Sequence, residues 1–337
     1  MKWIKHLLMT ATVLTALLFT GVRLLSTTHA VQVLPAPTLP PPAETAAKPL
    51  PELPPETQIP PDPRIPACEE AAGRVQAGCV FVYDVTGREM LFSNIPATQR
   101  IYPASITKLF SAYVALQYLA PDTVITAGWE LGMLKPGSST AFIAMDSRLT
   151  AEMLVEAMLL PSGNDAAYIL SAAAGRAIAG QTQIGARKAV AVFLEEMNRM
   201  GQELGLANSH FENPDGYHHE NHYSCPGDLA TIGELALQNA VIAKYARRQQ
   251  DSVRFASGET ITWYNTNRLL NPESAWYCEK AIGLKTGYTT EAGYCLLSAF
   301  EEAGQQYLVG IFDAANTLSR YSDAVMLFET ANQTGDG

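Results

Sequence analysis

Ser105 and Lys108 are the residues of this sequence whose types and spacing most directly suggest chemistry. They follow Pro103 and open a run with apolar residues at helical spacing. Proline is favoured in the first turn of a helix, because the N–H groups there have no partner within the helix. Residues three apart share one helical face, so the Ser105 hydroxyl is expected beside the Lys108 amine, at the positive end of the helix dipole. A serine nucleophile with a lysine base requires this arrangement.

Two further polar motifs could complete such a site. Ser162 and Asn164 interrupt two helical stretches rich in alanine and leucine, where buried polar groups need hydrogen-bond partners. Lys285-Thr286-Gly287 puts a cation beside a hydroxyl, a combination that suits a carboxylate ligand. The glycine would let a ligand or another backbone approach the strand closely.

Each motif taken alone also has a purely structural interpretation. A serine and a lysine three apart are expected about once by chance in a chain of this length, and would fit a capped core helix. Ser162 and Asn164 would fit a helix–helix turn in which they act as caps. The lysine-threonine-glycine triplet would fit a bulge at a strand edge. The three motifs therefore indicate a site only in combination.

Periodicity predicts strands near both ends of the folded part and helices in its middle, which is typical of an α+β protein. The elements that would position the motifs are strands over 78–84, 89–92, 259–264, 294–300 and 307–312, and helices following Ser105 and over 149–160, 187–204, 228–241 and 318–330.

The N-terminus has the pattern of an export signal. Lys2 and Lys5 precede an apolar run over 7–22, and small residues at 28–30 fit a signal-peptidase site. We therefore predict that residues 1–30 are a signal peptide or a retained N-terminal membrane anchor, and both alternatives stay open. Either one places the protein on the extracytoplasmic side of the membrane.

A proline-rich stretch follows this signal. Of the 21 prolines in the chain, 13 fall between residues 35 and 66, which favours an extended chain without a core. We predict a disordered linker or stalk over 31–67, a catalytic domain over 68–332 and a short tail over 333–337.

The composition excludes several kinds of partner. The net charge of −10 argues against a nucleic-acid surface. None of the five cysteines shows C-x-x-C spacing, so no zinc site is predicted from them. Cys68 with Cys79, and Cys225 with Cys278, are candidate disulfide pairs, whereas Cys295 lies in an apolar run and fits a buried free thiol.

Histidines cluster at His218, His219 and His222, around Glu220. The zincin pattern needs two residues between the glutamate and the second histidine, and only Asn221 separates them here. We therefore predict a polar loop near the mouth of the site, and no metal.

The three motifs, in this order, make up the constellation of penicillin-recognising serine enzymes. Longer blocks extend the similarity over about residues 75–330, namely YPASITK, PSGNDAA, FENPDG with HYSCPGDLA, NTNRLL and GLKTGYTTEAGYC. On these blocks the chain resembles the serine D-alanyl-D-alanine carboxypeptidases, the low-molecular-mass penicillin-binding proteins of peptidase family S11. The resemblance implies a serine β-lactamase/transpeptidase-like fold, with an antiparallel sheet flanked by helices, a mostly helical lobe and the site in the cleft between them.

The resemblance also implies a reaction and its catalytic residues. Ser105 would attack the carbonyl between the two terminal D-alanines of a peptidoglycan stem pentapeptide, and Lys108 would take its proton as a neutral amine. Burial and the charge of Lys285 are expected to lower the pKa of Lys108. Ser162 would relay a proton to the leaving D-alanine, and water would release the acyl-enzyme. β-Lactam antibiotics would be covalent inhibitors on the same serine, and no cofactor is needed.

The remaining site residues would bind the peptide. Asn164 would hold its backbone, while Lys285 and Thr286, in the motif completed by Gly287, would bind the terminal carboxylate. The backbone N–H groups of Ser105 and Tyr288 would form the oxyanion hole. Two departures from the family matter. Tyr288 stands where many members carry histidine, and the small β-rich domain and C-terminal anchor of many members are absent, so any membrane attachment is expected at the N-terminus.

Two alternative functions stay open from the sequence. A class A β-lactamase would need a glutamate that activates the deacylating water. Glu195 and Glu196 lie at about the right distance after Ser162, but within a regular amphipathic helix. A non-catalytic wall-binding module is the second alternative, although binding alone does not need an activated serine.

Overall fold

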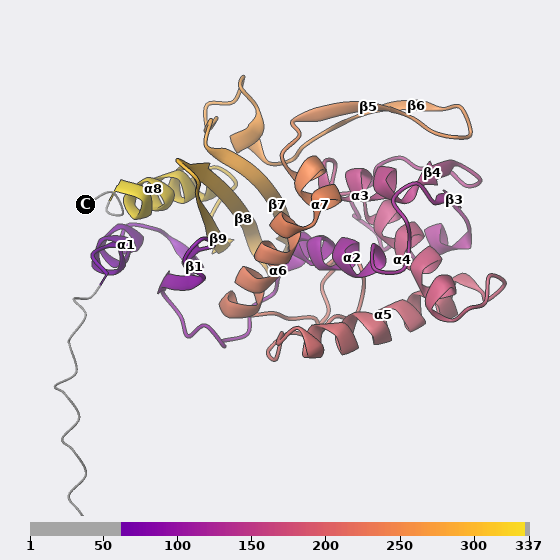
Figure 1. Cartoon of the computed structure of the whole chain (residues 1–337), viewed down its shortest axis with the longest axis horizontal. Coiled ribbons are helices and arrows are strands. Elements are labelled where there is room, and N and C mark those ends of the chain that lie inside the picture. Colours follow the sequence, from indigo (N-terminus) through magenta and orange to yellow (C-terminus); the bar gives the residue numbers. More distant parts are fainter. Residues whose placement is uncertain (1–61, 334–337) are drawn as a thin grey trace, which may run out of the picture. The chain divides into compact units, whose positions relative to one another are not determined.

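A five-stranded antiparallel sheet forms the framework of the computed structural model, which describes residues 62–333. The strands lie in the order β2-β1-β9-β8-β7 (Figure 1). Their side chains are buried along most of β8 and β9, because helices cover both faces of the sheet. The strands are β1 (Ala77–Asp84), β2 (Glu89–Ser93), β7 (Ala281–Thr289), β8 (Gly293–Glu302) and β9 (Gln305–Ala314).

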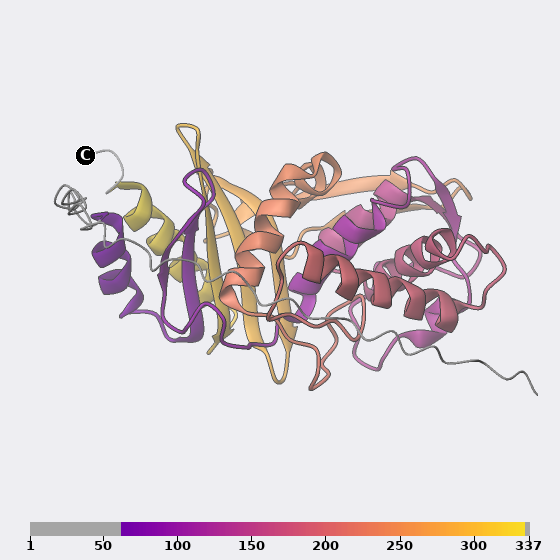
Figure 2. The same ribbon diagram turned by 60° about the horizontal axis from the view of Figure 1, so that its bottom comes forward.

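Helices at the two ends of the described chain pack together on one face of this sheet. They are α1 (Arg64–Ala72) and α8 (Ser319–Gln333), which share one apolar cluster with that face. Helix α6 (Pro226–Gln238) contacts β1 and β9 from the other face (Figures 1 and 2). The predicted α+β fold, with an antiparallel sheet flanked by helices, is confirmed.

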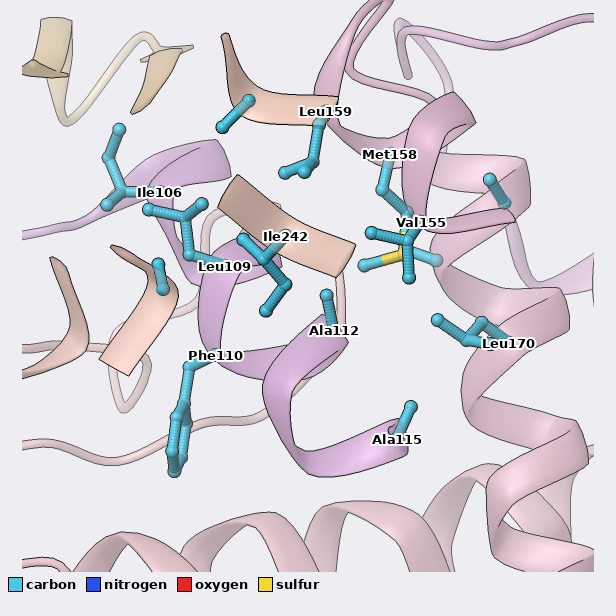
Figure 3. Packing of buried hydrophobic residues seen from close by; sticks show 14 of the residues in the cluster. Ile106, Leu109, Phe110, Ala112, Ala115, Val155, Met158, Leu159, Leu170 and Ile242 are labelled. Atoms are coloured by element: carbon cyan, nitrogen blue, oxygen red, sulfur yellow. The ribbon is translucent and has the colours of Figure 1, made fainter. Parts of the chain in front are cut away.

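A mostly helical lobe surrounds α2 (Thr107–Ala115), the helix that follows Ser105. Nearly every residue of α2 is buried, because neighbouring helices pack around it. Figure 3 shows part of this core, where Leu109 and Ala112 meet Val155 and Ile242. The surrounding helices are α3 (Ala151–Leu159), α4 (Asn164–Ile178), α5 (Ala186–Glu203), α6 and α7 (Ala240–Ala246).

Two small two-stranded sheets and three short 3₁₀ turns complete the described elements. Strand β3 (Val124–Thr126) pairs with β4 (Arg148–Thr150), and β5 (Gln250–Arg254) pairs with β6 (Thr260–Tyr264). The 3₁₀ turns are η1 (Ala104–Ile106), η2 (Trp129–Met133) and η3 (Arg268–Leu270).

Several predicted boundaries differ from the observed elements. The helix predicted over 149–160 begins only at Ala151, because Leu149 and Thr150 pair with β3. The helix predicted over 228–241 is broken at Asn239, whose side chain accepts hydrogen bonds from the first N–H groups of α7. Strands β3, β4 and β5 are not among the predicted elements, and α1 begins at Arg64, within the span expected to be linker.

Both candidate disulfide pairs are wrong, since all five cysteines are free thiols. Cys68 belongs to the apolar cluster under α1 and α8, whereas Cys79 belongs to the cluster on the opposite face of the sheet. Cys278 likewise packs on the α1–α8 side, whereas Cys225 caps α6 on the other side. A sheet therefore separates the partners of each pair. Cys295 is fully buried and free, as predicted.

The predicted signal or anchor over 1–30, almost all of the linker over 31–67 and the last four residues of the tail over 333–337 lie outside the described residues. Within residues 62–333, none of the helices is both long and apolar enough to cross a bilayer.

Candidate active site

Ser105 lies in η1, at the entrance to α2, and Lys108 lies in the first turn of that helix. The Lys108 Nζ donates a hydrogen bond of 2.8 Å to the Ser105 Oγ. It donates a second bond, of 2.7 Å, to the backbone carbonyl of Asp215. The spacing of three residues thus brings amine and hydroxyl into contact, and a loop from elsewhere in the chain supports the amine.

Burial changes the acidity of this amine. Lys108 is fully buried, and burial lowers its pKa to about 8 because the ammonium loses hydration, although the charges of Asp215 and Asp165 act in the opposite direction. The pKa of Lys285 is also lowered, by burial first and then by the positive charges of Lys108 and Arg320. A lysine amine of this acidity is available in its neutral form near pH 8, where it can take a proton from a hydroxyl.

A pocket of about 580 Å³ opens onto the Ser105 hydroxyl. Its lining includes six of the eight residues predicted for the site, namely Ser105, Ser162, Asn164, Thr286, Gly287 and Tyr288. The other two, Lys108 and Lys285, do not line the pocket and are buried behind its surface. The Lys285 Nζ donates to the carbonyl of Thr286 at 3.0 Å.

Ser162 and Asn164 enter the pocket from the link between α3 and α4. Ser162 adopts a left-handed backbone conformation (φ 64°), which is uncommon for a residue other than glycine. The Ser139 Oγ donates to the Ser162 carbonyl at 2.7 Å, and the Asn164 N–H donates to the Ser139 carbonyl at 2.9 Å. The residue at the N-cap of α4 is Gly163, so neither polar side chain caps the helix. The simple cap interpretation is therefore wrong, and the motif is held by Ser139.

Strand β7 forms the opposite wall, at the edge of the sheet. A Cβ atom at Gly287 would lie 3.0 Å from the backbone nitrogen of Ser105, tighter than ordinary van der Waals contact. The glycine thus allows β7 to approach the turn that carries Ser105. The Thr286 Oγ1 forms a hydrogen bond of 2.6 Å with the Thr266 Oγ1, which orients the threonine beside the pocket.

Comparison with known proteins agrees with this architecture. The sequence profile of peptidase family S11, D-alanyl-D-alanine carboxypeptidase, matches residues 67–316. The chain belongs to this family. It is 31% identical over 246 residues to the D-alanyl-D-alanine carboxypeptidase of Streptomyces sp. (strain K15), which covers 70% of this chain and 80% of the relative. It is 28% identical over 258 residues to the D-alanyl-D-alanine carboxypeptidase DacF of Bacillus subtilis (strain 168), covering 75% of this chain but only 61% of the relative.

The fold of this S11 family chain is similar to a solved structure. The crystal structure of the Streptomyces K15 DD-transpeptidase superposes with a TM-score of 0.68 at 26% sequence identity. The superposition covers 77% of this chain and 98% of that one. The similarity therefore extends through nearly the whole of that structure.

Asp215 is a site residue that the sequence analysis missed, although it lies in the FENPDG block. Its carbonyl accepts from Lys108, and its carboxylate is buried, which raises the pKa of the carboxyl group. The next residue, Gly216, has a φ of 81°, and a Cβ there would lie 1.9 Å from the carbonyl oxygen of Ala104. Only glycine lets this loop reach the turn of Ser105.

Arg320 is a second missed residue, and no local motif marks it because it lies in α8. It lines the pocket, although only 7% of its surface is exposed. Its Nη1 donates to the carbonyl of Gly287 at 3.2 Å and to that of Cys295 at 2.9 Å. Its Nε has no hydrogen-bond partner among the described residues. The guanidinium therefore lies beside Gly287 at the pocket, with its Nε buried and unpaired within residues 62–333.

The histidine cluster divides between the pocket and the core. His218 lines the pocket, as a polar loop at its mouth would. His222 is buried, and burial lowers its pKa to about 3. Its Nδ1 accepts from the Glu212 N–H, so its Nε2 donates to the Thr107 hydroxyl at 2.8 Å. His222 thus ties the loop to the first residue of α2.

Neither glutamate considered for a β-lactamase lies at the site. Glu195 and Glu196 lie within α5, and neither lines the pocket. Glu196 instead bonds to Arg199 and Tyr118. The described pocket thus offers neither of these groups to activate a deacylating water.

Proposed function

We propose that this chain is a serine D-Ala-D-Ala carboxypeptidase that removes the terminal D-alanine from peptidoglycan stem pentapeptides. The observation that carries the proposal is the buried Lys108 amine, 2.8 Å from the Ser105 hydroxyl beside an open pocket. Membership of the S11 family supports the choice of substrate.

Acylation would begin at Ser105. As its Oγ bonds to the scissile carbonyl carbon, the hydroxyl proton passes to the neutral Nζ of Lys108. The developing oxyanion would be stabilised by the backbone N–H groups of Ser105 and Tyr288. The C–N bond then breaks, and the leaving D-alanine amine receives a proton relayed through Ser162. Water hydrolyses the resulting ester in a second step.

The substrate's terminal carboxylate would lie near Thr286 and Arg320. Both residues line the pocket, and Arg320 is the cation that reaches its surface there. Lys285, which is buried behind the strand, would support the threonine through its hydrogen bond to the Thr286 carbonyl. Asn164 would bind the peptide backbone from the opposite wall. A requirement for a free carboxylate makes the reaction a carboxypeptidase reaction.

We also propose that β-lactams acylate Ser105 and that the catalytic domain over 68–332 acts outside the cytoplasm. The proposal follows from the peptidoglycan substrate and from the export pattern of residues 1–30. Residues 31–61 would then act as a tether if residues 1–30 are retained.

Labelling with a fluorescent penicillin, together with release of D-alanine from a peptide ending in D-Ala-D-Ala, tests the proposed function. The wild-type protein is expected to take up a long-lived label and to release D-alanine. Ser105→Ala should lose both activities, whereas Ser252→Ala, at an exposed serine on β5, should keep both. Rapid turnover of penicillin would instead support a β-lactamase, and absence of a label would support the wall-binding module.

A further inference from the structure

One end of the pocket carries a pair of polar side chains that the proposed reaction does not use. His218 and Glu291 both line the pocket, and the His218 Nδ1 lies 3.8 Å from the Glu291 Oε2. The His218 Nδ1 is buried and has no hydrogen-bond partner among the described residues. The ring of Tyr102 meets the imidazole edge-on, with 4.8 Å between ring centroids, and so holds it in place.

The spacing of the pair suits a cationic ligand. A separation of 3.8 Å is too long for a direct hydrogen bond. In a neutral imidazole whose proton is on Nε2, Nδ1 is an acceptor, and the carboxylate is a second one. A primary ammonium carries three donors, so it can bond to the exposed Glu291 carboxylate and also to the His218 Nδ1 once the partly exposed imidazole ring turns toward the pocket. Among residues 62–333, Glu291 forms no ion pair with lysine or arginine, so its charge is open to a ligand.

The position of the pair relates it to the scissile bond, an argument that rests on the proposed function. If the terminal carboxylate lies at Thr286 and the scissile carbonyl at Tyr288, the rest of the peptide continues along β7 toward Glu291. Strand β7 ends at Thr289 and Glu291 lies in the turn that follows, so from Thr286 to Glu291 the chain advances by at most roughly 16 Å. Three extended peptide residues cover roughly 10 Å. The side chain of the third residue from the C-terminus therefore has at most roughly 6 Å left to span, which is within the reach of a lysine-like chain.

We propose that His218 and Glu291 form a subsite for the side-chain ammonium of a diamino acid that directly precedes D-Ala-D-Ala. The substrate class is thus a stem peptide whose third residue still carries a free amine. A stem peptide in which that amine is already acylated, as in a crosslink, loses the charge and two of the three donors and fits the subsite less well.

The expected preference is modest. The Glu291 side chain is 44% exposed, so solvent and salt weaken its attraction for the ammonium. We expect the free amine to raise kcat/KM by about 3- to 10-fold over the acetylated form. The ratio should fall as salt is added.

Two synthetic peptides test the subsite. Nα-acetyl-L-Lys-D-Ala-D-Ala carries the free amine, and Nα,Nε-diacetyl-L-Lys-D-Ala-D-Ala does not. The kcat/KM for D-alanine release is measured for both peptides with the full-length protein. The wild-type protein should favour the free amine. Glu291→Gln should bring the ratio close to one, and Glu291→Lys should invert it.

A matched control separates the subsite from a general effect of charge. Glu273→Gln removes an exposed carboxylate elsewhere on the surface and should leave the preference as it is in the wild type. Equal kcat/KM values for the two peptides in the wild type, or a preference that survives Glu291→Gln, would overturn the subsite while leaving the proposed function intact. If neither peptide releases D-alanine, the proposed function fails, and the subsite fails with it.

Discussion

At the scale of single residues, the chemistry of the site depends on which of its basic side chains are buried. Lys108 and Lys285 are both fully buried, and each loses hydration that would favour its ammonium form. Arg320 carries a guanidinium and lines the pocket. The geometry thus offers one amine that can become neutral beside the hydroxyl and one guanidinium where a carboxylate would bind.

The acidity of Lys108 predicts the pH dependence of acylation. Below its pKa of about 8 the amine is protonated and cannot accept the hydroxyl proton, so the rate should rise with pH. We expect the second-order rate constant for penicillin acylation to increase about tenfold per unit at pH well below 8 and to level off above it. Stopped-flow measurements between pH 6 and 9.5 check this. A flat profile over that range would show that another group takes the proton.

Arg320 predicts a loss of substrate binding. Arg320→Leu removes the guanidinium near Thr286, so kcat/KM for a peptide with a free carboxylate should fall by about 10- to 100-fold, the worth of a charge-assisted hydrogen bond. The same peptide with an amidated C-terminus should be affected far less. Arg254→Leu, at an exposed position in β5, serves as the control. Equal losses for the free acid and the amide would contradict a role in carboxylate binding.

At the scale of elements, the site is formed where glycine residues let the backbones of different elements approach one another closely. Strand β7 can lie against η1 because Gly287 has no Cβ, and the loop that carries Asp215 reaches the same turn because Gly216 has none. The link between α3 and α4 is held in an unusual conformation by Ser139. Each motif therefore owes its position to contacts with another element.

Gly287→Ala tests the approach of β7. The new methyl group would lie 3.0 Å from both the Ser105 nitrogen and the Ala104 Cβ, so strand and turn must separate by a few tenths of an ångström. We expect penicillin acylation to slow by about 10-fold or more, because small misplacement of reacting groups is costly. Gly132→Ala, where nothing lies within 4 Å, is the matched control. Unchanged acylation in Gly287→Ala would show that the close approach does not position the serine.

At the scale of the described molecule, the sheet separates the pocket side from a second apolar layer. Helix α8 belongs to that layer, yet its Arg320 lines the pocket on the other side. The hydrogen bonds from Arg320 to the carbonyls of Gly287 and Cys295 therefore connect the two sides. Helix α1 closes the layer, and Arg64 in its first turn pairs with Asp84 at the end of β1. The Asp84 side chain is only 4% exposed, so without Arg64 its carboxylate would be almost buried and would lack this cationic partner.

Arg64→Ala should therefore destabilise the whole domain. Removing one member of a largely buried ion pair leaves the other charge uncompensated, and we expect a loss of about 2 kcal/mol in the free energy of unfolding. Urea unfolding at pH 7 checks this value. Arg74→Ala, at an exposed arginine just after α1, should cost little. Similar unfolding midpoints for the two variants would mean that the pair between Arg64 and Asp84 does not stabilise the domain.

Local patterns in the sequence were enough to predict the features that depend on neighbours along the chain. A spacing of three along the continuous turn from η1 into α2 puts the Lys108 amine beside the Ser105 hydroxyl. Alternating and helical periodicity likewise indicated the first hairpin, α5 and the β8–β9 pair. The family resemblance supplied the expectation that Ser162 and Lys285 belong with them.

The tertiary structure alone decided what depends on distant segments meeting. Arg320 reaches the site from α8, and the Asp215 carbonyl reaches it from a loop. No spacing along the chain predicts either contact. The same holds for the cysteines: Cys68 and Cys79 are close in sequence, yet the sheet lies between them. Packing determines which face of a sheet an element covers, and that choice is a property of the whole chain rather than of any one stretch.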